Sequence, residues 1–243
     1  MTQFEELIKR VDKAASRMGG LIAILLAVKE RRSKDVTYDG ADFYVKGVKV
    51  KAELINREMA RVELKVGLTI ISYNKKLWDR TWTLSQWQKA MERLTEENHL
   101  LFAALAWGGV EFVLSKTEKD RAAAEILKRR TERDLKAVGK FAQAIKDKQV
   151  PNEQATNNRG RSYIRAWFVT YHILSHRAHI IAGYREAKSM LTIAEHCQDK
   201  KTASGFRPGC LELNRKGWLP IREMTPIGLR TCKQWCKCYI IYR

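Results

Sequence analysis

The segment spanning residues 36–74 constrains the fold more than any other part of this chain, because its side chains alternate in character. Around Gly47, Val48 and Val50 alternate with Lys49 and Lys51, and apolar residues alternate with charged ones again over residues 61–66. Alternation with a period of two places successive side chains on opposite faces of a β-strand. We therefore expect a β element within residues 42–74, with one apolar face and one mostly cationic face.

A set of residues in this segment and just beyond it forms an ordered pattern. A Tyr-Asp pair precedes a Phe-Tyr-x-Lys-Gly run, a lysine follows four positions after the glycine, a Tyr-Asn pair ends the segment, and a Thr-Leu pair opens a predicted helix. The residues are Tyr38, Asp39, Phe43, Tyr44, Lys46, Gly47, Lys51, Tyr73, Asn74, Thr83 and Leu84. Over residues 36–94 this pattern resembles the first lobe of the nucleoproteins of segmented negative-strand RNA viruses, most closely those of orthobunyaviruses.

The resemblance implies a nucleoprotein that encapsidates single-stranded genomic RNA without strong sequence preference. It further implies homo-oligomers joined by terminal arms, presentation of the RNA to a viral polymerase, and a location in the virion and the host cytoplasm. The chain departs from the family pattern at Gln86, where a basic residue is expected, and Lys89 stands about one helical turn further on. The residues that match RNA contacts of the family are Lys46 and Lys51 and, more weakly, Arg57 and Arg93.

The charge balance independently favours a polyanion as partner. The chain has 46 Lys+Arg against 27 Asp+Glu, which gives a net charge of +19, and basic residues occur along its whole length. Such a charge attracts polyanions, and the phosphates that it neutralises release counterions. Ribosomal, chromatin and membrane-surface proteins share this property, so the charge alone leaves the kind of polyanion open. The hydrophobic content of 45% in 243 residues is enough for a core and argues against disorder throughout.

We expect a mainly α protein with a small β-hairpin element, arranged as two lobes with terminal arms and a basic RNA groove between the lobes. The predicted divisions are an N-terminal arm with the start of the first lobe (1–35), an N-terminal lobe (36–150), a C-terminal lobe (151–220) and a C-terminal arm (221–243). Residues 151–160 are polar and rich in turn formers, and we interpret them as an inter-lobe linker or an exposed loop.

The N-terminal arm is predicted to bind a neighbouring copy of the chain. Apolar residues at helical spacing over residues 3–17 give an amphipathic helix with one apolar side. The oligomerisation contacts expected on that side are Phe4, Leu7, Ile8 and Val11. Residues 18–28 superficially resemble a signal peptide, but a basic segment replaces the cleavage site and the stretch is too short to span a membrane. A buried helix or an oligomerisation arm is the favoured interpretation, and no membrane insertion is expected.

Further helices are indicated by apolar spacing and by capping residues. An apolar face formed by Leu84, Trp87, Met91 and Leu94 predicts one helix, and the apolar run over residues 100–114 predicts a central buried helix. A long charged helix is expected to begin at the capping pair Thr117 and Asp120 and to end before Pro151. A helical pattern then runs from residue 161 to about residue 197, with a break near Gly183.

The helix that begins at residue 161 carries a stripe of potentially cationic side chains. At 100° per residue these fall within about 60° of one another, which suggests a rail for phosphates. The alternative is an ordinary solvated helix face. A zinc site at the His pair four residues apart is disfavoured, because no HExxH motif surrounds it. The residues of the stripe are Arg161, Arg165, His172, His176 and His179.

Basic residues next to aromatic ones are the remaining candidates for RNA binding, because single-stranded RNA exposes base faces as well as phosphates. The candidates for base stacking are Tyr44, Trp78 and Tyr163. The candidate phosphate contacts outside the stripe are Lys46, Lys49, Lys51, Arg57, Lys75, Lys76, Arg80, Lys89 and Arg93. Each of these positions also has a structural alternative, as a core aromatic or as a solvated charge.

Cysteine usage and missing motifs limit the other functions. The five cysteines, none before Cys197, do not form a disulfide framework for a chain of this size. Cys232, Cys236 and Cys238 do not have a standard zinc spacing, Cys210 or His196 would have to supply a fourth ligand, and cysteines packed as small hydrophobes are favoured. No catalytic motif occurs, so we expect no catalytic residue, metal or cofactor. A basic membrane-associated matrix protein and an RNA-processing nuclease remain alternatives.

Overall fold

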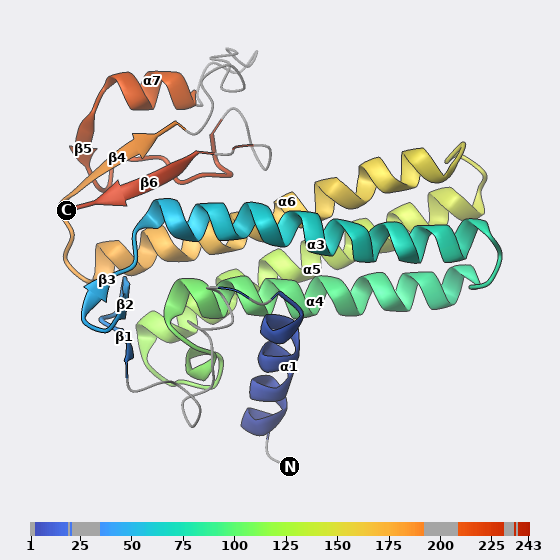
Figure 1. The fold of residues 1–243 in the computed structure, drawn as a ribbon, viewed down its shortest axis with the longest axis horizontal. Helices are drawn as coiled ribbons and strands as arrows, with labels where there is room; N and C mark the ends of the chain where they lie inside the picture. The colour runs from blue at the N-terminus through green and yellow to red at the C-terminus, as the bar shows by residue number, and fades with distance from the viewer. Residues whose placement is uncertain (1–2, 19, 21–34, 192–208, 231–235, 237) are drawn as a thin grey trace.

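The computed structural model of the chain describes residues 3–18, 20, 35–191, 209–230, 236 and 238–243 (Figure 1). Within these ranges the chain is mainly helical, as expected, and carries two small antiparallel sheets of three strands each. The helices are α1 (Gln3–Met18), α3 (Ala52–Trp78), α4 (Leu84–Trp107), the 3-10 helix η1 (Glu111–Val113), α5 (Glu118–Lys146), α6 (Glu153–Ile181) and α7 (Cys210–Arg215). The strands are β1 (Val36–Tyr38), β2 (Phe43–Val45), β3 (Val48–Lys49), β4 (Glu186–Met190), β5 (Trp218–Pro220) and β6 (Tyr239–Tyr242).

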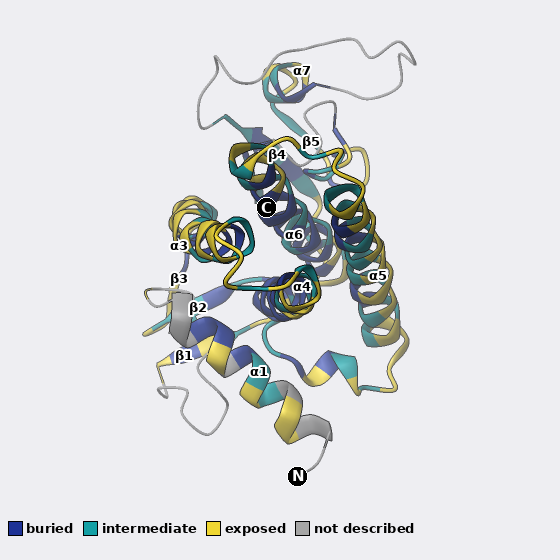
Figure 2. Ribbon diagram, turned by 90° about the vertical axis from the view of Figure 1, so that its right-hand side faces the viewer, coloured by how far each residue is buried: buried dark blue, intermediate teal, exposed yellow. Residues whose placement is uncertain are grey.

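Helix α4 lies at the centre of a helical body formed by α1, α3, α4, α5 and α6 (Figure 2). Residues 97–106 of α4 are all buried, and the predicted apolar face with Trp87, Met91 and Leu94 is buried as well. The Thr83 side chain accepts a hydrogen bond from the Gln86 amide, and the Gln86 side chain accepts one from the Thr83 amide. This capping box fixes the start of α4 and gives Gln86 a structural role. The helix ends at Trp107, with Gly108 as its C-cap. The two helices predicted on either side of residue 97 are therefore one helix, which stops earlier than the expected residue 114.

The predicted strand over residues 61–66 is wrong, because these residues lie in the middle of helix α3. The buried residues of α3 are Ile55, Met59, Val62, Val66, Ile70 and Asn74, which follow one another at helical spacing. Val62 and Val66 therefore fit both a period of two and a period of 3.6, whereas Leu64 between them is 72% exposed. The true period is visible only over the longer run from residue 55 to residue 74.

The β element is a short three-stranded sheet at residues 36–49. Strand β2 pairs with β1 on one side and with β3 on the other, with Val45 opposite Val48. Lys46 and Gly47 connect β2 to β3 with positive φ angles of 51° and 75°. Two consecutive residues with positive φ form the type of turn that suits the twist of a hairpin, and a glycine tolerates it best. The hairpin predicted around Gly47 is thus confirmed.

The predicted linker over residues 151–160 is also wrong. Asn152 caps helix α6, and its side chain accepts a hydrogen bond from the Ala155 amide at 2.9 Å. The polar residues that follow belong to the first turns of α6, which begins eight residues before the expected helix start at residue 161. A Cβ atom on Gly160 would lie 2.4 Å from Ile70 Cγ2, so this glycine allows α6 to pack closely against α3. The Thr117 cap of α5 is as predicted, since its side chain accepts from the Asp120 amide.

The two predicted arms pack against their own chain. Val11, Ala14 and Ala15 of α1 are buried in the core of the helical body, and Arg10 forms an ion pair with Glu96 of α4 at 3.3 Å. Ile8 also packs against this core. The side chains of Phe4 and Leu7, and residues 19 and 21–28 of the signal-peptide-like stretch, lie outside the described residues. Within the described ranges, no helix has both the length and the apolar character needed to cross a bilayer.

We call residues 184–191, 209–230, 236 and 238–243 the C-terminal unit. In its sheet β4 lies between β5 and β6, and the chain end expected to form an arm supplies β6. The helical pattern expected up to residue 197 ends at Ile181, and residues 192–208 lie outside the described ranges. Figure 1 places the C-terminal unit and the β1–β3 hairpin at one end of the long helices, and the α3–α4 and α5–α6 connections at the other end.

Candidate nucleic-acid interface

A surface groove of about 430 Å³ lies between α1, α3 and α4, and its charged rim is mostly basic. Lys13 of α1, Tyr73 of α3 and Lys89, Arg93 and Glu97 of α4 line it. The three α4 residues follow one another at intervals of four, so they share one helix face. Arg93 Nε donates to the buried Glu97 carboxylate at 3.0 Å, which orients the guanidinium. Three cations against one carboxylate leave the groove positive, and we name it the basic groove.

Two half-buried aromatic residues and an exposed lysine extend the basic groove toward the α3–α4 connection. The rings of Tyr73 and Trp82 are 5.1 Å apart between centroids, and the Lys76 ammonium lies 4.6 Å from the Trp82 ring centroid. Aromatic faces next to cations suit nucleic-acid bases attached to phosphates. The sequence had suggested Lys76, Lys89 and Arg93 but not Lys13 or Trp82, because the crossing of α1 over α4 has no signal in local spacing.

The stacking candidate Trp78 has a structural role instead. Its indole Nε1 donates to Thr156 Oγ1 at 3.0 Å, which ties the end of α3 to the start of α6. Tyr163 is buried, and its hydroxyl donates to the Ala137 carbonyl oxygen at 3.1 Å. Tyr44 is half-buried and donates to an Asp39 carboxylate oxygen at 2.9 Å. Of the three stacking candidates, Tyr163 is therefore wrong, since no base can reach a ring inside the core.

The hairpin lysines lie at the opposite end of α3 from the basic groove. Lys51 and Lys75 are 24 positions apart, which at 1.5 Å per helical residue is about 36 Å. Lys46, Lys51, Lys75 and Arg80 are exposed, as is Arg57, which pairs with Glu53 at 3.2 Å. In contrast, the Lys49 ammonium lies 2.5 Å from the Asp42 carboxylate, which neutralises it.

The outer face of α3 connects these two ends. Arg57, Arg61 and Lys65 follow one another at intervals of four and are exposed. Leu64 and Leu68, 72% and 68% exposed, lie beside them on the same face. We call this surface, over residues 54–75, the α3 outer face. It combines side chains that attract phosphate with apolar side chains that lack a partner in the described chain.

The stripe on α6 is neither a phosphate rail nor a solvated face. Arg165 is buried and forms a two-point ion pair with Glu63 of α3, with Nε 2.8 Å from one carboxylate oxygen. His176 and His179 are only 5% and 4% exposed. Burial lowers the pKa of His172 to about 3 and that of His176 to about 4. Only Arg161 of the stripe is exposed, because this face of α6 packs against α3, the hairpin and β6.

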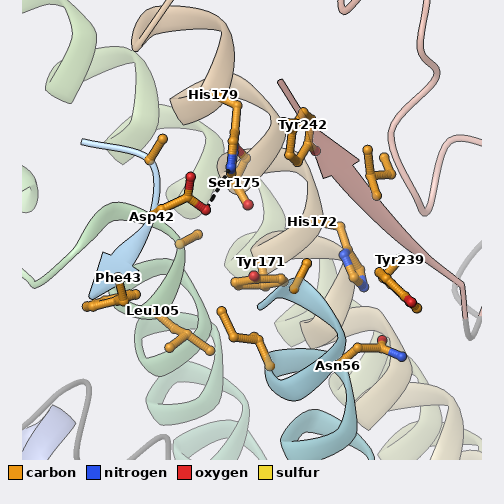
Figure 3. Close-up of a pocket in the computed structure, with 15 residues that line it drawn as sticks. Asp42, Phe43, Asn56, Leu105, Tyr171, His172, Ser175, His179, Tyr239 and Tyr242 are labelled. Atoms are coloured by element: carbon orange, nitrogen blue, oxygen red, sulfur yellow. Dashed lines mark hydrogen bonds and ion pairs between the residues drawn. The ribbon is translucent and has the colours of Figure 1, made fainter. Parts of the chain in front are cut away.

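A narrow crevice with a volume of about 30 Å³ opens at the end of this face (Figure 3). His179 Nε2 lies 3.3 Å from an Asp42 carboxylate oxygen, its Nδ1 lies 2.7 Å from the Ser175 carbonyl oxygen, and its ring stacks on Tyr242 at 3.8 Å. Both ring nitrogens thus contact oxygen atoms of the protein itself. The space admits about one water molecule. This His-Asp pair joins the hairpin to α6.

A second histidine network lies inside the helical body and was missed from the sequence. His99 of α4 bonds to Thr170 of α6 at 2.8 Å and to Asp134 of α5 at 3.0 Å. The Asp134 carboxylate, held by His99 and Arg133, has a pKa below its usual range despite its burial. The network joins three helices, and its members are 36 and 35 residues apart along the chain, so no local motif marks it.

Comparisons with known proteins return no match to any protein family, curated protein or solved structure. Any assignment of function therefore rests on the residues of this chain.

Proposed function

We propose that this chain binds single-stranded RNA, and that the basic groove is the principal contact. The observation that carries the proposal is the convergence of Lys13, Lys89 and Arg93 from two helices on a groove that also exposes Tyr73. A groove of this kind grips phosphates with its cations and a base face with its aromatic ring, and neither contact depends on nucleotide sequence. The net charge of +19 adds a long-range attraction for any polyanion.

The α3 outer face gives the RNA a path beyond the basic groove. Its cations, Arg57, Arg61 and Lys65, lead from the α3–α4 end toward Lys46 and Lys51 at the hairpin end. A backbone that follows this face meets three cations over residues 57–65, of which Arg57 and Arg61 also pair with Glu53 and Glu58. This supports sequence-tolerant packaging better than recognition of one short motif, for which a single compact site would suffice.

In biological terms, the proposal is a viral nucleoprotein that encapsidates single-stranded genomic RNA in the virion and the host cytoplasm. It rests on the resemblance of residues 36–94 to orthobunyavirus nucleoproteins together with the basic groove. Assembly into a ribonucleoprotein, contact with a viral polymerase and a two-lobed arrangement belong to the same proposal, in which the basic groove takes the place of the groove expected between the lobes. The predicted arms, α1 and β6, pack on their own chain and are therefore less available to join copies. We propose that the exposed Leu64 and Leu68 also contribute to contacts between copies.

Binding of a labelled single-stranded RNA of mixed sequence tests the proposal. Replacing Lys89 and Arg93 by Ala removes two phosphate contacts, so the slope of log affinity against log salt should fall by about 1.4, at about 0.7 per contact. The matched control replaces Lys136 and Lys140 on the outer side of α5, which are exposed and carry the same charge. Equal losses in the two variants would mean that only total charge matters, and would overturn the groove as the site.

A membrane-surface function is the second candidate, and the α3 outer face favours it. Leucines interleaved with Arg and Lys on an exposed helix suit the interface of an anionic bilayer. Flotation of the RNA-free protein with anionic vesicles distinguishes the two functions. Replacing Leu64 and Leu68 by Gln should abolish flotation if the face binds lipid, whereas RNA affinity should then survive in the same variant.

A further inference from the structure

The C-terminal unit brings three cysteines together. The Sγ atoms of Cys210, Cys236 and Cys238 all lie within 4.8 Å of one another, and all three residues are buried. Cys210 begins α7, and the other two precede β6, which pairs with β4 at the centre of the sheet (Figure 1). Cys236 and Cys238 lack a standard zinc spacing on their own. The fold supplies the missing partner, because Cys210 comes from 26 residues away.

The distances suit a shared metal ion better than a disulfide. Thiolates bound to one tetrahedral Zn²⁺ at about 2.3 Å lie about 3.8 Å from one another. Cys210 Sγ and Cys236 Sγ are 3.2 Å apart, and no pair in the cluster exceeds 4.8 Å. A disulfide would need about 2.05 Å and would use only two of the three sulfurs. Small adjustments of side-chain torsions would therefore place all three sulfurs around one ion.

The positive charge of Arg230, next to the three cysteines, also favours a bound metal ion. Arg230 is fully buried, and within the described chain it forms no ion pair with a carboxylate. Its guanidinium donates to the Thr225 carbonyl oxygen and to Ser189 Oγ, both at 2.8 Å, and it lies 3.7 Å from Cys210 Sγ. A buried cation without an anion is costly. Three thiolates and a water molecule as the fourth ligand of Zn²⁺ carry a net charge of −1, which Arg230 would balance.

The small size of the C-terminal unit also favours a stabilising metal ion. Its core consists of nine buried residues, and its longest strand has five residues. A unit this small seldom holds its shape by apolar burial alone and is commonly stabilised by a metal or by disulfides. We propose that Cys210, Cys236 and Cys238 bind one structural Zn²⁺ as thiolates, each losing its proton on binding, with Arg230 as the compensating charge beside Cys210.

Metal analysis of the full-length protein, purified without chelator, tests this inference. We expect about one zinc per chain by mass spectrometry of the metal content, and its release on titration with a mercurial that modifies thiols. Replacing zinc by Co²⁺ should give thiolate-to-cobalt charge-transfer absorption and the visible bands of a tetrahedral site. Purified protein that holds no thiolate-bound zinc and takes up none from solution, or a disulfide among the three cysteines, would overturn the proposal.

Variants separate loss of ligands from loss of fold. Cys236→Ala and Cys238→Ala should each lose the zinc, whereas Leu213→Ala, which removes a buried side chain from the same core, should retain it. Arg230→Met keeps the length and removes the charge, so zinc affinity should fall at least about tenfold. Zinc retained by both cysteine variants would show that the metal binds elsewhere. RNA affinity at the basic groove should be the same with and without chelator, so the two proposals fail independently.

Discussion

The helical body and the C-terminal unit keep their interiors from water in different ways. The body buries a continuous apolar cluster that draws on α1, α3, α4, α5 and α6, and its His99 is satisfied by two neighbouring helices. The C-terminal unit buries a cluster of nine hydrophobic residues, of which three are cysteines, next to the buried charge of Arg230. Buried area grows with size, so a large body can rely on packing whereas a small sheet cannot.

The two parts also differ in where they place their charged and reactive side chains. In the helical body, most cations lie on the surface, and the buried Arg165 is neutralised by the Glu63 carboxylate. In the C-terminal unit, groups with chemical reactivity are kept inside. The body thus offers an outer surface to a polyanion, and the C-terminal unit offers an inner site to a metal.

The largest expected effect is on the free energy of unfolding, when a buried leucine is replaced by alanine in each part. Leu101→Ala in the fully buried centre of α4 should cost about 3 kcal/mol and lower the unfolding temperature of the whole body. Leu213→Ala should leave that transition in place and increase amide hydrogen exchange mainly in β4, β5 and β6. Calorimetry and hydrogen exchange measure the two results. A single transition lowered equally by both variants would mean that the two parts unfold as one.

The next largest effect is on the pH dependence of stability and involves His176, which lies where α6 meets β6. Desolvation, aided by the nearby His179 and Arg230, lowers its pKa to about 4, below the unfolded value of about 6.5. Its stabilisation is therefore fully present above pH 6.5 and is lost as the pH falls toward 4, by about 2 kcal/mol at pH 5. His176→Gln should remove that part of the acid sensitivity in urea titrations. The exposed Arg177→Gln is the control, and an unchanged pH profile in H176Q would contradict the assignment.

The smallest expected effect is on RNA affinity between pH 8 and pH 6. Because His172 and His176 have pKa values of about 3 and 4, they stay neutral over this range and add no charge for phosphate. Affinity measured by fluorescence anisotropy should change less than about twofold. A steep rise toward pH 6 that His176→Gln removes would mean that the α6 face opens and binds RNA, contrary to the packed structure.

Local signals in the sequence were sufficient for much of the helical body. The cap at Thr117 and the turn at Gly47 each depend on neighbouring residues, and both were predicted correctly. The apolar run that begins at residue 100 is buried in a helix as expected, although that helix ends at Trp107. The misreading of residues 61–66 as a strand arose from a window too short to separate two periods. The polar start of α6 looked like a loop, because the residues that cap and open a helix are also turn formers.

The candidate sites were harder to predict, because they depend on contacts between distant segments. Helical geometry gave the correct set of residues for the α6 stripe, but it does not say whether a face is covered, and Glu63 and β6 cover this one. The basic groove needs α1 to cross α4, and the cysteine cluster needs α7 to meet the residues before β6. None of these contacts between distant segments produces a periodic pattern in the sequence.

The length of α3 has a consequence for how much RNA one chain would cover. Lys51 at the hairpin and Tyr73 in the basic groove are 22 positions apart, which at 1.5 Å per helical residue is about 33 Å along α3. Stacked nucleotides advance by about 3.4 Å each, so an oligonucleotide needs about ten of them to reach from one end to the other. The length of α3 would then set the number of nucleotides that one chain binds. Affinity should rise with oligonucleotide length up to about that size and level off beyond it, and a protein with more tightly clustered cations would saturate sooner.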